Sequence, residues 1–321
     1  MSIPQSHSFP FDPTYGYSLE RLQQVGVPEA PEGFDVFWRQ KYDAALAVPV
    51  QVERKPSKLS DPRWTVEEVR YVSTDGVRIG AWLLTPKNRP IRQGIVVGHG
   101  YGGRDGPDFD FPGTDAVLLF PCARGMSLSA QPPFPSMSVW HVLHQIEEPE
   151  KYLIGGCVQD IWVSVSVLSV LHPDIADRIG YSGISFGGGL GALAIPFDRR
   201  VRRGFLEVPT FGNRPLWLQL PTTGSAASVQ IYAKTHPGVG EKLRLFDAAT
   251  AASRITVPML VAAAQFDPAV APPCQFAVAN ALPRNQFNQI FILDAGHFEY
   301  PGEQMQHAAL SDRVRQFFGV P

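Results

Sequence analysis

The chain has 321 residues, of which 44% are hydrophobic and 18% charged, so it is long and apolar enough to bury a sizeable core. Glycine and proline, 29 and 30 residues, stay well below the roughly 25–30% of a chain that marks low-complexity disorder. The 28 basic residues nearly balance the 30 acidic ones, and the net charge of −2 excludes the large positive field of a general nucleic-acid-binding protein.

Residues 1–60 are predicted to form an N-terminal helical arm. Residues 18–24 and 34–46 have apolar side chains at helical spacing, and the second segment places Phe34, Phe37 and Trp38 on one side. This apolar side either packs on the chain's own sheet or is offered to another copy of the chain. The start of the chain has neither the basic residues nor the apolar stretch of a secretory signal, so we expect a cytoplasmic protein.

A hairpin and a series of buried strands follow the arm. Residues 64–72 and 77–84 flank Thr74-Asp75-Gly76, and Asp-Gly is a strong hairpin signal. Six short apolar runs then look like strands buried on both faces: residues 94–98, 116–120, 178–182, 203–208, 258–264 and 289–293. Helical segments lie between several of them: residues 158–171, 188–196, 273–281 and 303–318. This alternation predicts an α/β protein with a mostly parallel sheet and helices on both faces.

Residues 210–248 do not follow this alternation and are predicted to be an insertion over the rim of the sheet. The sequence has no evident linker, so we expect residues 1–321 to form a single domain. The longest nearly apolar run, residues 161–171, is interrupted by three serines and falls short of the ~20 residues of a membrane span, so we expect no membrane partner.

The sharpest motif is Gly183-Ile184-Ser185-Phe186-Gly187, a G-x-S-x-G between a predicted strand and a glycine-rich helical segment. In that context the motif forms a tight turn in which a Cβ at either flanking position would clash, and the serine Oγ is exposed at the positive end of a helix. We therefore predict that Ser185 is a nucleophile. The alternative is a glycine-rich turn that contains a bystander serine.

A serine of ordinary pKa needs a base, and in this fold an acid lies between the serine and the histidine in the sequence. His297 follows the last predicted strand, with one helix after it. Asp267 ends the strand at 258–264, on the rim where the active site of such a sheet lies. Asp294 is too close to His297 along the chain to approach its ring from behind, and Asp247 is a weaker candidate at the end of the irregular segment.

The loop from Gly98 to Gly103 follows an early strand and is predicted to complete an oxyanion hole. The two backbone N–H donors are assigned to Tyr101 and to Phe186, the residue after the nucleophile. The loop lacks the Lys-Ser/Thr of a phosphate-binding loop. We expect His99 to be structural, with its ring hydrogen-bonded to the loop backbone.

Metal and disulfide chemistry are not predicted. His141 and His144 stand three residues apart, but no third ligand of known spacing accompanies them, so we expect packing or surface histidines and no metal. Cys122, Cys157 and Cys274 are odd in number and far apart, which indicates buried free thiols.

Taken together, these motifs resemble the acetyl xylan esterase / cephalosporin-C deacetylase family of α/β hydrolases over most of the chain. The resemblance rests on PEAPEGFDVFWRQKYDAAL in the arm, GVRIGAWLLTP, HGYGG, ARG, GISFGGGL, FDPAVAPP and GHFE. It implies a triad of Ser185, Asp267 and His297, an oxyanion hole at Tyr101 and Phe186, and a structural role for Arg124 beside the site. It also implies that no cofactor is needed and that the protein is a homo-oligomer, in the family often a ring-like hexamer.

Three positions depart from the family pattern. Met126 stands where the family has the glutamine of Arg-Gly-Gln, Phe186 replaces the usual glutamine after the nucleophile, and Phe298 interrupts the family's His-Glu. These changes bear on substrate preference more than on catalysis, because the triad and the oxyanion hole use other atoms.

The sequence thus predicts a serine carboxylesterase that deacetylates small esters of sugars or related compounds such as cephalosporin C. The alternatives are a peptidase or amidase on the same triad, a short-chain acyl esterase, and a non-catalytic binding protein that retains the fold. The acyl group is expected beside Phe186, Tyr101 and the loop from Pro209 to Phe211. The aromatic rings of Phe186, Tyr101 and Phe211 would leave little room there, which favours acetyl over longer acyl groups. If Phe186 turned away instead, an apolar slot for longer acyl chains would open.

Overall fold

The computed structural model describes residues 7–112, 115–285 and 287–319. Within them lies a nine-stranded sheet of order β1-β2-β3-β5-β4-β6-β7-β8-β9. The strands are β1 (Val52–Pro56), β2 (Trp64–Val72), β3 (Arg78–Pro86), β4 (Gln93–Gly98), β5 (Ala116–Pro121), β6 (Ile179–Ile184), β7 (Val201–Glu207), β8 (Met259–Ala264) and β9 (Gln289–Leu293). The pairs β1–β2, β2–β3 and β3–β5 are antiparallel and all later pairs are parallel, which confirms the mostly parallel sheet.

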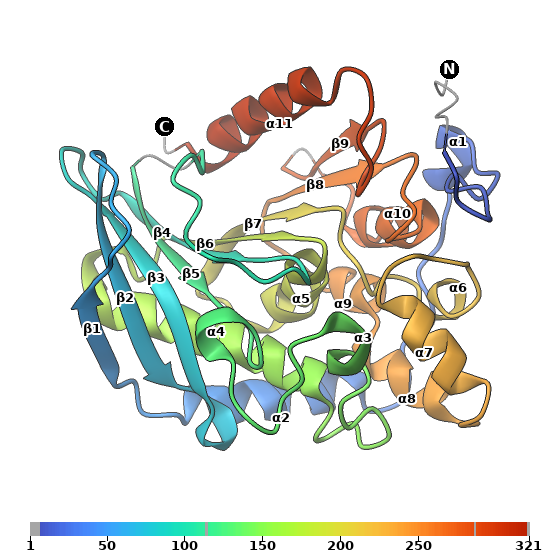
Figure 1. The fold of residues 1–321 in the computed structure, drawn as a ribbon, viewed down its shortest axis with the longest axis horizontal. Helices are drawn as coiled ribbons and strands as arrows, with labels where there is room; N and C mark the ends of the chain where they lie inside the picture. The colour runs from blue at the N-terminus through green and yellow to red at the C-terminus, as the bar shows by residue number, and fades with distance from the viewer. Residues whose placement is uncertain (1–6, 113–114, 286, 320–321) are drawn as a thin grey trace.

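Helices cover both faces of the sheet, as expected (Figure 1). They are α1 (Leu19–Leu22), α2 (Phe34–Leu46), α3 (Ser138–His141), α4 (Leu153–Leu171), α5 (Phe186–Ala194), α6 (Arg214–Trp217), α7 (Ala226–Ala233), α8 (Val239–Leu243), α9 (Ala248–Ala252), α10 (Pro272–Ala281) and α11 (Glu303–Phe318). On one face α4 and α5 contact the strands directly, and α2 and α9 pack against them. On the other face α11 buries its apolar side. Because both faces are covered, every residue of β5 and β8 is buried.

The hairpin between β2 and β3 forms where Asp-Gly predicted it. Asp75 and Gly76 both have positive φ, 59° and 70°, as the twist of a tight hairpin turn requires. The Val77 N–H donates to the Thr74 carbonyl at 3.2 Å and closes the turn. Strand β1 was not predicted. Its sequence VERKP is mostly exposed and charged, which suits an edge strand but gives no alternating apolar signal.

The apolar side of the arm packs on the chain's own helices. Phe34, Phe37 and Trp38 are almost fully buried. The Trp38 indole N–H donates to the Leu245 carbonyl at 2.8 Å, and its ring meets that of Trp162 edge-on. The idea that this side is left exposed for another copy of the chain is therefore wrong.

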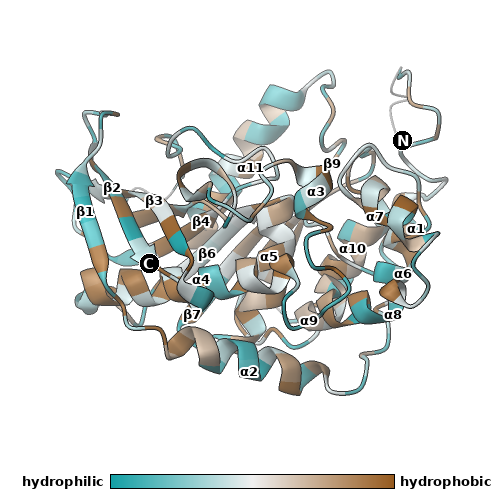
Figure 2. Cartoon of the chain, turned by 60° about the horizontal axis from the view of Figure 1, so that its bottom comes forward, coloured by the Kyte–Doolittle hydropathy of each residue, from teal (hydrophilic) through white to brown (hydrophobic). Residues whose placement is uncertain are grey.

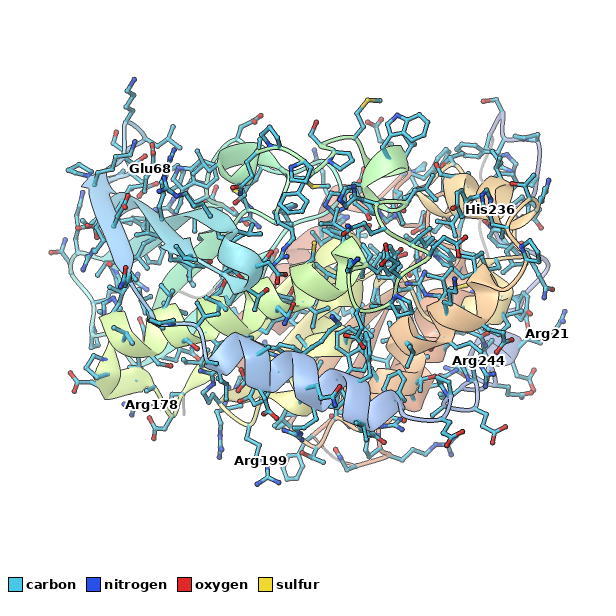
Figure 3. The ribbon with its side chains drawn as sticks, turned by 90° about the horizontal axis from the view of Figure 1, so that it is seen from below. Arg21, Glu68, Arg178, Arg199, His236 and Arg244 are labelled. Carbon is cyan, nitrogen blue, oxygen red and sulfur yellow. The ribbon has the colours of Figure 1, made fainter. Side chains whose placement is uncertain are left out.

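Figure 2 shows hydrophobic and hydrophilic residues alternating along α2, as expected for a helix with one face on the core. Figure 3 shows charged side chains such as Arg178 and Arg199 pointing outward at the edge of the molecule.

Helix α4 begins five residues before the predicted start at residue 158. Gly155 and Gly156 have low helix propensity, so the sequence pattern did not indicate a helix over these residues. A Cβ at Gly156 would lie 2.3 Å from Nη1 of Arg124, so glycine here makes room for a buried guanidinium.

In the described residues α4 is also the one helix long and apolar enough to cross a membrane, with a mean hydropathy of 1.6. Of its most apolar stretch of 18 residues, 83% is buried inside the fold.

The rim segment at 210–248 contains helices that the sequence did not predict. Helices α6, α7 and α8 are only 4, 8 and 5 residues long and are separated by Gly- and Pro-containing turns. Stretches this short show too few turns for an apolar period to stand out. Helix α7 contacts α3, and both lie beside the carboxyl ends of the parallel strands (Figure 1).

The docking of the arm predicts a large loss of stability on Trp38→Ala. The variant removes a fully buried indole and its hydrogen bond, so the free energy of unfolding should fall by about 3–5 kcal/mol. Urea unfolding measures this change. The matched control is Val36→Ala on the same helix, where a side chain that is 61% exposed should change stability by less than about 0.5 kcal/mol. Equal effects of the two variants would show that the arm is not docked in solution.

Candidate active site

Ser185 lies on the sharp turn between β6 and α5. Its φ and ψ of 53° and −108° are unfavourable for a residue with a side chain, a strain typical of functional sites. The Ser185 N–H donates to the Glu207 carbonyl of β7 at 2.8 Å and holds the turn against the sheet. A Cβ at Gly183 would lie 2.4 Å from the Gly187 carbonyl oxygen, and one at Gly187 would lie 2.9 Å from His99 O. Both flanking positions therefore admit only glycine, as the motif predicted.

The structure brings the three predicted triad residues together. The Ser185 Oγ lies 3.0 Å from Nε2 of His297, and Nδ1 of His297 lies 2.8 Å from Oδ2 of Asp267. A proton on Nδ1 is held by the carboxylate, so the lone pair of Nε2 faces the serine hydroxyl. The three side chains come from turns that follow β6, β8 and β9, all at the carboxyl edge of the parallel strands.

The Asp267 carboxylate is fully buried and accepts four hydrogen bonds. Its Oδ1 accepts the N–H groups of Ala269 and Val270 at 2.8 and 2.9 Å. Its Oδ2 accepts His297 and the Gln275 side-chain amide, each at 2.8 Å. Sequence reasoning missed Gln275, because a lone glutamine on α10 carries no motif. Its position next to the acid appears only when the helix is folded onto β8.

The N-terminal residues also contact the acid. The Asp267 N–H donates to the Pro13 carbonyl at 3.1 Å. The Tyr15 hydroxyl donates to the Pro221 carbonyl at 2.6 Å and so ties the same segment to the rim insertion. Contacts between residues this far apart in the chain leave no pattern in the sequence.

The two rival acids have other partners. Asp247 is the N-cap of α9, where its carboxylate accepts the Thr250 N–H at 2.8 Å. Asp294 follows β9, and its N–H donates to the Gln306 side chain at 2.9 Å. Neither carboxylate is hydrogen-bonded to His297 among the described residues.

The base has a raised pKa. Burial disfavours the charged imidazolium of His297 and works against this shift. The hydrogen bond and the negative charge of Asp267, with a further contribution from Glu207, outweigh burial and hold the pKa of His297 above its ordinary value of 6.5. A raised pKa makes His297 a stronger proton acceptor once it is neutral.

The predicted oxyanion loop lies over the nucleophile. The Gly187 N–H donates to His99 O at 2.9 Å and joins the elbow to the loop, and a Cβ at Gly100 would lie 3.7 Å from the Cβ of Ser185. Phe186 is the first residue of α5, so its N–H has no partner within the helix. None of the hydrogen bonds found in the described part of the chain uses the N–H of Tyr101 or of Phe186. Both amides are thus free to donate, and their role in an oxyanion hole stays a prediction.

His99 supports this loop from inside, as expected. Its Nδ1 donates to the Gly100 carbonyl at 2.6 Å, and its Nε2 accepts the Ala123 N–H at 2.9 Å. Burial lowers the pKa of His99 to about 4, so the ring is neutral at physiological pH and both hydrogen bonds persist.

A cavity of about 340 Å³ opens at the nucleophile. Ser185, His297 and Tyr101 line it, together with polar side chains such as Thr210 and Thr223. Its apolar lining comes from aliphatic side chains, chiefly those of Val139, Ile184 and Val270.

Two of the residues expected to line this pocket lie behind it. Pro209 and Phe211 are buried, and the residue between them, Thr210, is the one that reaches the cavity. The Phe186 ring is also fully buried. It stacks on Tyr101 at 4.0 Å and meets Phe211 edge-on. The expectation that Phe186 and Phe211 crowd the acyl group is therefore wrong, because aromatic packing draws both rings into the core.

Arg124 lies in a buried ion pair. Its Nε and Nη2 donate to the two carboxylate oxygens of Asp160 at 2.9 and 2.7 Å, and Nη2 also donates to Thr74 Oγ1 at 3.1 Å. Burial works to lower the pKa of Arg124, but the charge and hydrogen bonds of Asp160, with smaller contributions from Cys157 and Asp75, together raise it. The pair joins α4 to the β2–β3 turn, which agrees with a structural role.

The two histidines considered for a metal are held in other ways. His141 is buried; its Nε2 donates to the Arg124 carbonyl at 3.0 Å and its Nδ1 lies 3.4 Å from the Tyr101 hydroxyl. Burial lowers the pKa of His141 to about 4. The ring of His144 meets Phe134 edge-on. Within the described residues, no group of three His, Cys, Asp or Glu side chains is placed to hold a metal ion, and all three cysteines are buried and free.

Comparison with known proteins gives a family match and structural neighbours. A family model described as Acetyl xylan esterase (AXE1) matches residues 14–311. Acetyl xylan esterase 1 from Thermoanaerobacterium sp. JW/SL YS485 is similar in structure with a TM-score of 0.77 at 20% identity, over 95% of this chain and 99% of that one. An acetyl xylan esterase from Paenibacillus sp. R4 gives 0.78 at 21% identity, over 92% and 99%.

More distant neighbours share the α/β-hydrolase fold. The acylaminoacyl peptidase of Pyrococcus horikoshii has a TM-score of 0.60 at 15% identity, over 80% of this chain and 41% of that one. Together with the topology of the sheet, these likenesses confirm the α/β-hydrolase fold.

The close fit of the histidine loop predicts that Gly296→Ala impairs turnover. A Cβ at Gly296 would lie 2.5 Å from Oδ2 of Asp267 and would push the carboxylate away from His297. We expect kcat for p-nitrophenyl acetate to fall roughly 100-fold, the effect of a displacement of about 1 Å at a catalytic group. Gly26→Ala is the matched control, since its Cβ would meet no atom within 4 Å. An unchanged kcat in Gly296→Ala would contradict this geometry.

The raised pKa of His297 predicts the acidic limb of the pH profile. Only the neutral ring accepts the serine proton, so activity is lost as the pH falls through the pKa of His297. We expect kcat/KM to rise with pH with a midpoint above 6.5 and to level off at higher pH. Asp267→Asn removes the charge that raises this pKa, so its residual activity should have a lower midpoint. A native midpoint at or below 6.5 would refute the assignment.

Proposed function

The chain belongs to the acetyl xylan esterase family, which makes it a serine carboxylesterase of the carbohydrate acetylesterase type, and we propose that it removes acetyl groups from acetylated xylo-oligosaccharides and related small esters, cephalosporin C among them, by a Ser-His-Asp mechanism. The observation that carries the mechanism is the continuous hydrogen-bonded series from Ser185 through His297 to the buried Asp267. No metal or organic cofactor enters this chemistry.

Acylation begins when Ser185 Oγ attacks the acetyl carbonyl carbon. His297 Nε2 accepts the hydroxyl proton, and Asp267 stabilises the imidazolium that forms. The negative charge on the carbonyl oxygen is stabilised by the N–H groups of Tyr101 and Phe186, and one such donor contributes about 10²–10³ in kcat. When the tetrahedral intermediate collapses, the bond to the sugar oxygen breaks, and His297 returns its proton to that oxygen.

Deacylation repeats the sequence with water. His297, now neutral again, accepts a proton from a water molecule that attacks the acetyl-Ser185 carbonyl. The same two N–H groups stabilise the second oxyanion. Breakdown of this intermediate releases acetate, and the proton on His297 passes back to Ser185 Oγ.

The residue after the nucleophile supports the same assignment. The proposed donor at Phe186 is its backbone N–H, whereas its side chain points into the core and stacks on Tyr101. The exchange of the family's glutamine for phenylalanine therefore leaves the donor in place. It also fixes Tyr101, whose own N–H is the second donor.

The decisive experiment is a series of p-nitrophenyl esters from acetyl to octanoyl, with acetylated xylo-oligosaccharides beside them. The Phe186 and Phe211 rings do not border the cavity, so the expected preference rests on the family match: kcat/KM should be highest for acetyl and fall toward butyryl. Ser185→Ala is the control and should lower kcat by roughly 10⁴-fold or more. A maximum at four carbons or beyond would favour the short-chain esterase, and faster hydrolysis of an aminoacyl amide would favour the peptidase or amidase.

A further inference from the structure

A second cavity, of about 220 Å³, lies beside the catalytic cavity at the carboxyl ends of β4, β6 and β7. Helix α11 and the loop at residues 108–112 close it from the other side. Ligands in parallel α/β sheets bind at this edge. On its own the cavity is smaller than the ~300–1,000 Å³ of typical ligand pockets, so it serves better as an extension of a larger site.

One residue joins the two cavities. Ile184, which is 42% exposed, lines both of them and directly precedes Ser185. Glu207 lines the second cavity, and its backbone carbonyl accepts the hydrogen bond from the Ser185 N–H. A ligand that extends from the nucleophile across Ile184 would therefore enter the second cavity directly.

The carboxylate of Glu207 lines the second cavity and accepts no hydrogen bond from the described residues. The Glu207 side chain is only 16% exposed, and no hydrogen bond found in the described residues reaches its oxygens. The closest charged contact found there is Nδ1 of His307, 3.9 Å from Oε1, too far for a hydrogen bond. Burial raises the pKa of Glu207, although the nearby His307 and His297 act in the opposite direction. A buried acceptor of this kind is stabilised by a ligand that donates hydrogen bonds.

The remaining walls fit a ring with hydroxyl groups and an apolar face. Phe111, Phe205 and Leu310 supply apolar surface, and Ser311 supplies a hydroxyl. Asp108 at the same cavity adds a second carboxylate, so the charge disfavours an anionic ligand. A pyranose presents hydroxyl donors around its edge and C–H groups on its faces, which matches this lining.

We propose that the second cavity binds the sugar unit next to the one that carries the acetyl ester, with Glu207 accepting hydrogen bonds from its hydroxyl groups. The inference rests on the proposed function, to which it adds the place where the neighbouring sugar unit of an acetylated oligosaccharide binds. The enzyme then hydrolyses the ester faster when the acetylated sugar has a neighbouring sugar unit. This selectivity acts on the alcohol side of the ester and not on the acyl side.

The test compares two substrates, a methyl xyloside with one acetyl group and the corresponding acetylated methyl xylobioside. The measured quantity is the ratio of kcat/KM for the disaccharide ester to that for the monosaccharide ester. We expect a ratio of roughly ten or more in the native enzyme, the size of one hydrogen bond to a charged acceptor. Ser311→Phe places a ring in the second cavity and should bring the ratio close to one. Glu207→Gln keeps the shape but removes the charge, and should lower the ratio as well.

The matched control is Ala308→Phe, which adds the same ring at an exposed position of α11 and should leave the ratio unchanged. A native ratio near one, or a ratio that neither Ser311→Phe nor Glu207→Gln lowers, would overturn the subsite while the monosaccharide ester is still cleaved. If the native enzyme cleaves neither sugar ester, the proposed function fails and the subsite fails with it. The two failures are thus distinguished by the monosaccharide ester alone.

Discussion

Three backbone segments come close together at the nucleophile: the turn after β6, the loop after β4 and the end of β7. The rest of the site depends on this close approach. A Cβ at Gly187 would clash with the backbone of Gly98 and His99 in the loop after β4, and a Cβ at Gly183 would clash with the Gly187 backbone. The hydrogen bond from Gly187 N–H to His99 O holds the turn and the loop together. Ser185 has a positive φ in this turn and lines the catalytic cavity. A site built in this way is preorganised, because its donors are fixed before any substrate enters.

The buried Asp267 forms the second fixed point of the site. Four donors hold its carboxylate, so His297 is oriented by a group that cannot rotate away. A buried carboxylate would be costly if left without partners. Here its partners come from the acid loop itself, from α10 and from the histidine loop. The geometry of the base is thus set by packing on β8 and β9 rather than by the short loop that carries His297.

The sequence predicted those parts of the molecule that depend on local pattern. The buried strands, the Asp-Gly hairpin and the G-x-S-x-G elbow all have a period, a turn residue or a steric rule that a single segment reveals. Gln275 and the contact of Asp267 with Pro13 depend on distant segments, and so they carry no local signal. The pocket lining was predicted wrongly for the same reason. Residues next to Ser185 in the chain, such as Phe186, turned into the core because other aromatic rings were available there.

The hydrogen bond between the N–H of Asp267 and the Pro13 carbonyl joins two segments that the ribosome makes at different times. The two residues are 254 positions apart in the chain. At about 5–20 residues per second, this interval lasts roughly 13–50 s. The contact forms only after the acid loop has been synthesised, and a nascent chain that stops between Ser185 and Asp267 holds the nucleophile without its acid.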